Sequence, residues 1–162
     1  MKKAFIFTSL LAVIALVWAS IAGVVRIEEN KATDDLLASR YSSDKPELAF
    51  DYPSRYVLVE RGLSTGERGR HSIVLTDGPV DPMQSEGPTA ITVEMFQNDL
   101  DAYTSVSFAT GTSESNWKLG DGSLATTTID GKEGVAYRWS GLYEGESIVV
   151  ARPDYVYVFS VT

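Results

Sequence analysis

From Leu48 onward, apolar and polar residues alternate along the chain with a period of two. Successive side chains of a β-strand point to opposite faces, so this alternation predicts strands with a buried face. Segments rich in Gly, Pro, Asp and Ser separate these stretches, an order typical of an antiparallel meander with little helix. The predicted strands cover residues 48–52, 55–60, 71–76, 89–96, 124–130, 132–140, 147–151 and 155–162.

Two turns in this pattern carry specific signals. Proline has no N–H to donate to a ladder, so Pro53 belongs at a strand end, and Tyr52 before it favours extended backbone. The pair predicts a bend between two short strands. Asp130-Gly131 is a dipeptide favoured in two-residue hairpins, so it predicts a tight turn between neighbouring strands.

Helical signals are few. Thr33 is positioned to cap a short helix over residues 34–41, and Asn98 to cap another over 99–108, where Asp99 and Asp101 complement the helix N-terminus. The last strand, residues 155–162, is apolar on both faces and therefore needs cover on both sides.

The N-terminus has a different pattern. Lys2 and Lys3 precede an apolar run over residues 4–25, which as a helix is about 33 Å long and matches a bilayer core of about 30 Å. We expect residues 1–25 to be a single-pass membrane anchor or uncleaved signal; the alternative is a signal cleaved near Ala22. Positive charge stays inside, so the rest of the chain is expected outside the cytoplasm, anchored or secreted. Residues 26–47 are polar and predict a spacer.

The net charge and the absence of cysteine exclude several classes of binding partner and of covalent attachment. The net charge is −8, and the chain without Lys2 and Lys3 carries −10, which disfavours nucleic acid and anionic lipid surfaces. The chain has no cysteine, so it contains no disulfide and no lipoprotein attachment site. The expected partners are an envelope protein or a small ligand, with the membrane contacted through residues 4–25.

The order of these features resembles PsbP-like domains. The motifs that carry the resemblance are Phe50, Tyr52 and Pro53 followed by an aromatic at Tyr56 (usually Trp in that family), and a strand after a turn with Gly131, Gly134 and Tyr137. For residues 48–162 it implies an α+β fold, in which a curved antiparallel β-sheet has flanking helices, here preceded by one N-terminal transmembrane helix. Such domains ordinarily end in a helix, whereas this chain ends at Thr162 inside the last predicted strand. The resemblance also implies an accessory, binding or assembly role.

Catalytic and metal signatures are weak. His71 is the only histidine and, with no cysteine, makes a zinc site improbable; the chain has no Gly-x-Ser-x-Gly, phosphate-loop or dinucleotide motif, so no catalytic residue, metal or cofactor is expected. The candidate contacts with a ligand or partner lie in two loops: the acidic Asp77, Asp81 and Glu86, and the aromatic Trp117. Turn and capping roles are the commoner explanation for such acidic residues.

Three classes of function stay open. A tethered, non-catalytic binding or assembly module agrees with the expected location outside the cytoplasm and with the absence of catalytic motifs. A small envelope hydrolase that uses two carboxylates would need a deep acidic cleft. A purely structural stalk would expose no apolar patch.

Overall fold

The computed structural model describes residues 38–65, 68–78, 90–98 and 101–162, and at 63–65 and 68 only the backbone. The expected membrane anchor lies outside these ranges, and within them no helix is long and apolar enough to span a bilayer. By its internal contacts the chain divides into two units, Met1–Tyr56 and Val57–Thr162.

The described part of the first unit is a two-stranded antiparallel sheet of β1 (Ala38–Asp44) and β2 (Glu47–Pro53). Tyr41 and Phe50 face each other across the two strands with ring centroids 5.2 Å apart, and both are buried. The expected helix over 34–41 is wrong where it can be compared, because residues 38–41 pair in β1. Aromatic pairing across the strands outweighs the weak helical stripe. Pro53 is the last residue of β2, where the sequence places the bend.

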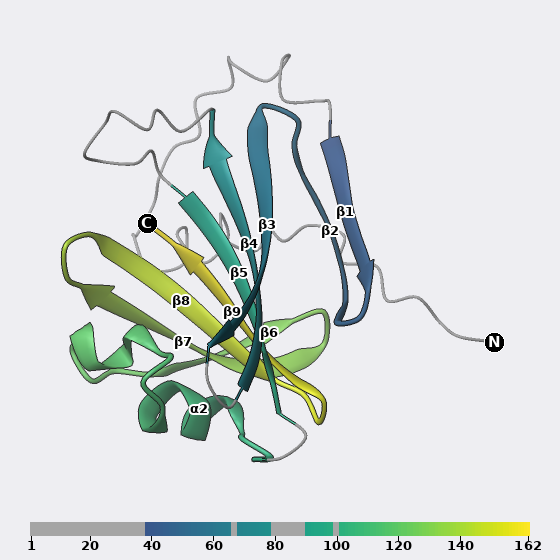
Figure 1. Cartoon of the computed structure of the whole chain (residues 1–162). Helices are drawn as coiled ribbons and strands as arrows, with labels where there is room; N and C mark the ends of the chain where they lie inside the picture. Colours follow the sequence, from purple (N-terminus) through teal and green to yellow (C-terminus); the bar gives the residue numbers. More distant parts are fainter. Residues whose placement is uncertain (1–37, 66–67, 79–89, 99–100) are drawn as a thin grey trace. The chain divides into compact units, whose positions relative to one another are not determined.

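The second unit contains a seven-stranded antiparallel sheet (Figure 1). Its order is β3-β4-β5-β9-β8-β7-β6. Strand β9 therefore lies inside the sheet, where it pairs with β5 on one side and with β8 on the other. The strands are β3 (Tyr56–Thr65), β4 (Arg68–Asp77), β5 (Ala90–Gln97), β6 (Ala125–Ile129), β7 (Lys132–Ser140), β8 (Glu144–Ala151) and β9 (Tyr155–Val161). Asp130 and Gly131, with φ of 49° and 69°, form the predicted tight turn between β6 and β7.

Both faces of this sheet are buried at its centre. In β9 the residues from Val156 to Phe159 are all at most 5 % exposed, which confirms the expectation that this strand is covered on both sides. One face, called the helix-side face below, contacts α2 (Ser105–Gly111), which packs on β7 and β8 (Figure 1). The opposite face carries buried apolar residues from five strands: Ile73, Leu75, Ile91, Val93, Met95, Tyr157, Phe159, Ile148, Val150 and Ala136.

The expected α+β class with flanking helices is wrong. The described residues hold nine strands, one α-helix of seven residues and one four-residue 3₁₀ turn, η1 (Asn116–Leu119), so the fold is mainly β. Helix α2 is capped by Thr104, which exchanges hydrogen bonds with Ser107 in a capping box. Asn98 is not a cap: it is 2 % exposed, and its side chain bonds the backbone of Tyr103 and Arg152. The described residues 101–104 are not helical, and α2 begins at Ser105.

Candidate functional site

The helix-side face of the large sheet has an apolar part and a polar part. Phe108 of α2 is fully buried and packs on Phe96, with ring centroids 5.1 Å apart, in a cluster that includes Val149 and Val156. This part of the face has the composition of an ordinary hydrophobic core. Polar side chains follow on the same face, across strands that are apolar on their other side.

These polar side chains form what we call the polar band: Arg70, Ser72, Thr92, Glu94, Ser147 and Ser160. The strand register brings them together. Ser72 lies opposite Glu94 on β4 and β5, while Ser160 lies opposite both Thr92 on β5 and Ser147 on β8. Since residues directly opposite in a sheet share a face, the six side chains cover one continuous area of four strands. Ser72 and Ser147 are buried, and the other four are half-buried.

An ion pair lies at one side of the polar band. Arg70 Nη2 donates to Glu94 Oε1, and the guanidinium also lies over the Phe96 ring, 5.5 Å from its centroid. The side chains are 29 % and 15 % exposed, so this pair is screened less by water than a surface pair. A guanidinium has five N–H donors, and Arg70 Nε is buried without a hydrogen-bond partner. The pair therefore combines a fixed carboxylate with one buried donor that has no partner.

A hydrogen-bonded network lies at the other side of the polar band. Trp139 Nε1 donates to Ser147 Oγ at 2.9 Å, and Ser147 Oγ is 2.8 Å from Ser160 Oγ. Tyr137 Oη lies 2.7 Å from Ser115 Oγ. Burial raises the pKa of Tyr137 and the charge of Glu94 adds to the rise, while hydrogen bonds from Ser115 and Ser147 oppose it. Tyr137 is thus a neutral hydrogen-bonding group at ordinary pH.

Trp139 is held over the sheet by close backbone approach. A Cβ added at Gly145, which lies opposite Trp139 on β8, would overlap the indole ring and come within 2.6 Å of the Val161 carbonyl oxygen. Only glycine leaves room for the ring at this place. The half-buried indole therefore has one defined position beside Ser147.

The residues expected to bind a ligand are not gathered in one place by the structure. Trp117 lies in η1, half-buried, with its ring edge-on to Tyr137 at 5.6 Å between centroids. It packs against the helix-side cluster, so it is less isolated than its polar sequence context suggests. Asp77 is exposed at the end of β4. Asp81 and Glu86 lie outside the described residues.

His71 lies on the face opposite the polar band. Its Nε2 is 2.7 Å from Glu60 Oε1, an ion pair when the imidazole is protonated. The contact is electrostatic, since Nε2 is buried and has no hydrogen-bond partner. Within the part of the chain that the structure describes, no three His, Asp or Glu residues gather as a metal site.

Sequence reasoning missed the polar band. The alternation in β5 assigns Thr92 and Glu94 to a solvent-facing side, yet Phe96 continues the same side and is buried. The sequence did contain a signal: Thr92 and Glu94 point to the same face of the strand as the large aromatic Phe96. Polar residues in such positions indicate a face that is half-buried. Their meeting with Ser147 and Ser160 depends on the register with β9, which pairs with β5 from far along the chain.

Comparison of the chain with protein-family models, with curated proteins and with solved structures finds no match. The candidate site is accordingly defined by this chain's own residues. Its chemistry is that of a half-buried ion pair, four hydroxyl side chains and an adjacent indole on one face of a β-sheet.

Proposed function

We propose that this chain is a non-catalytic binding module tethered at the outer side of the membrane, and that the polar band is its binding surface. The observation that carries the proposal is the half-buried Arg70–Glu94 pair on a face that the sheet otherwise uses for apolar packing. Charged side chains are seldom placed on such a face unless they are paired or have another role. The ligand would be a polar envelope component with hydrogen-bonding groups, either free or displayed on an envelope protein.

The chemistry of the polar band favours binding over hydrolysis. A glycosidase-type site needs two carboxyl groups about 5–9.5 Å apart. Among the described residues of β4, β5, β8 and β9, Glu94 is the one carboxylate on the helix-side face, and it is engaged by Arg70. The hydroxyls of Thr92 and Ser160 are half-buried beside it and suit recognition of a polar ligand.

The remaining parts of the proposal come from the sequence. Residues 1–25 would hold the module at the membrane, with Lys2 and Lys3 on the cytoplasmic side. The PsbP-like assignment belongs to this proposal as well, and it would place the chain among accessory and assembly factors. The stalk alternative predicts no exposed apolar patch, whereas Leu142 is 91 % exposed beside the half-exposed Tyr143.

A thermal-shift experiment with matched variants tests the proposal. The full chain in detergent is heated with and without fractionated envelope extract, alongside Glu94→Gln and Glu146→Gln. Glu146 pairs with Arg138 at 3.8 Å on the opposite face, so it is a control for loss of one carboxylate. A ligand at 100 times its Kd adds about 2.7 kcal/mol of stability, which raises Tm by several degrees.

We expect one fraction to stabilise the natural chain and Glu146→Gln, but not Glu94→Gln. Equal stabilisation of all three proteins would show that the ligand binds elsewhere. Release of a hydrolysed product from that fraction, lost in Glu94→Gln, would replace the binding module by the hydrolase alternative.

A further inference from the structure

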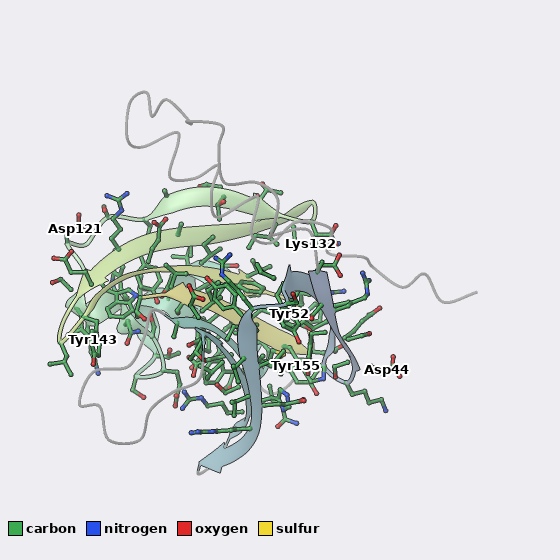
Figure 2. All side chains as sticks on the ribbon, turned by 90° about the horizontal axis from the view of Figure 1, so that it is seen from above. Asp44, Tyr52, Asp121, Lys132, Tyr143 and Tyr155 are labelled. Carbon is green, nitrogen blue, oxygen red and sulfur yellow. The ribbon has the colours of Figure 1, made fainter. Side chains whose placement is uncertain are left out.

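Exposed large apolar side chains gather at one end of the seven-stranded sheet. The structure describes six such side chains, and three of them, Leu119, Leu142 and Tyr143, occur at the turn between β7 and β8 or next to it. Their exposed fractions are 43 %, 91 % and 43 %. We call these three residues the apolar tip. Tyr143 and Asp121 lie at one end of the view in Figure 2, and Lys132, the first residue of β7 after the β6–β7 turn, lies toward the other end.

Backbone contacts hold the apolar tip in place. Gly141 N donates to the Tyr143 carbonyl oxygen at 2.8 Å, which closes the turn. A bridge between Gly120 and Trp139 fixes η1 on β7, and a Cβ at Gly141 would lie 3.2 Å from Leu119 Cδ1. Leu119 therefore lies beside Gly141, the residue that precedes Leu142 in the turn. A fixed, solvent-exposed cluster of this kind indicates a docking surface more than an accident of a loose loop.

The length of the chain before the described residues points to the occupant. Between the apolar run that ends at Val25 and the first described residue, Ala38, lie residues 26–37, which span at most about 43 Å when fully extended. If the run is the anchor, as the proposed function holds, Ala38 stays within that distance of the bilayer and the rest of the chain is tethered to the membrane surface. A weak apolar contact is then strengthened by a high local concentration of membrane surface.

We propose that the apolar tip docks in the interface of the bilayer that holds the chain. This inference rests on the tether in the proposed function. Leu142 would enter the acyl boundary, while the Tyr143 ring would lie at headgroup level, where an apolar body and a polar hydroxyl are both satisfied. Glu144 and Asp121 are exposed beside the tip, so contact with zwitterionic lipid is favoured over anionic lipid.

A lipid-quenching experiment tests this docking on the full chain. The chain has no cysteine, so Ser140→Cys, at an exposed position next to Gly141, accepts a single environment-sensitive fluorophore. The labelled protein is placed in phosphatidylcholine nanodiscs that contain spin-labelled lipid. Lys132→Cys gives the matched probe at the opposite turn. Carbonate extraction of vesicles that carry the chain first establishes whether residues 1–25 hold it in the membrane.

We expect quenching about twofold or more stronger at position 140 than at 132. Adding Leu142→Glu should abolish the difference, whereas Val106→Glu, at another exposed apolar position in α2, should preserve it. Retained anchoring with equal quenching at both positions would overturn the docking and leave the tether intact. Quenching that depends on the number of chains per disc would assign the tip to a second copy of the chain and would overturn the docking. Quenching at position 140 that persists in Leu142→Glu would show that the tip does not make the contact, and would overturn it as well. Extraction by carbonate would contradict the tether itself.

Discussion

The two faces of the seven-stranded sheet differ in the residues that the same strands place on them. In β5, Ile91, Val93 and Met95 are at most 5 % exposed on the face opposite the helix, while Thr92 and Glu94 occupy the helix-side face. In β9, Phe159 and Ser160 show the same contrast. At the centre of the sheet, one face is apolar and serves stability. The other changes from core to polar band within a few residues, which is the arrangement expected where a fold keeps a place for a ligand.

The largest loss of stability is expected when the aromatic centre of the helix-side core is removed. Phe108→Ala deletes a fully buried ring that contacts Phe96 and Tyr103. We expect the free energy of unfolding to fall by about 3–5 kcal/mol, because the cavity adds to the lost transfer energy. Urea denaturation measures the change. Val106→Ala, in the same helix and 49 % exposed, should cost less than about 0.5 kcal/mol, and similar losses in both variants would mean that α2 does not bury Phe108 as described.

The position of Trp139 is the next feature to test. Gly145→Ala places a methyl group against the indole ring, so we expect a loss of about 1–3 kcal/mol and a red shift of the Trp139 emission as the ring moves outward. Fluorescence during urea unfolding reports both quantities. Gly111→Ala is the control, because a Cβ there meets nothing within 4 Å. An unchanged spectrum in Gly145→Ala would contradict the close approach of ring and strand.

Two ion pairs, one on each face of the sheet, sharpen the contrast between the faces. Glu94→Gln leaves the half-buried Arg70 without its carboxylate, and we expect the free energy of unfolding to fall by about 1–2 kcal/mol. Glu146→Gln breaks the pair with Arg138, whose side chain is 56 % exposed, and should cost at most about 0.5 kcal/mol. Unfolding at low and high salt checks this order. If Glu146→Gln were the more damaging change, the polar band would have no special electrostatic role.

The smallest expected effect concerns Tyr137 at high pH. Its pKa is raised in the folded state, above an unfolded value of about 10. Below pH 10 both states keep the proton, and above it the unfolded state ionises first, so stability falls as the pH rises. Tyr137→Phe should cost about 1 kcal/mol at neutral pH through the lost bond to Ser115, and its stability should fall less steeply above pH 10. Parallel pH curves for the two proteins would exclude a raised pKa.

The local sequence pattern was enough to predict the strands, but not to predict the polar band on the helix-side face. Period-two alternation and the Asp130-Gly131 turn predicted β4 to β9 correctly, because hairpins are local. The flanking helices came from the resemblance to PsbP-like domains and were wrong, whereas the residues themselves indicated little helix. Asn98 has the residue type of a cap, yet a distant partner, Arg152, holds it in a loop. The polar band needs the β5–β9 register, which no short stretch of sequence contains.

The central claim is that the helix-side face binds a ligand through the polar band. Its most direct test is a photoreactive amino acid at Thr92, a half-buried member of the band, with the same group at Thr127 as control. Thr127 is also half-buried but lies on the opposite face, in β6. After irradiation in cells, the intact mass of the purified chain is measured. We predict one reproducible added mass at Thr92 that is absent at Thr127 and lost with Glu94→Gln. No adduct at Thr92, or the same adducts at both positions, would contradict the account.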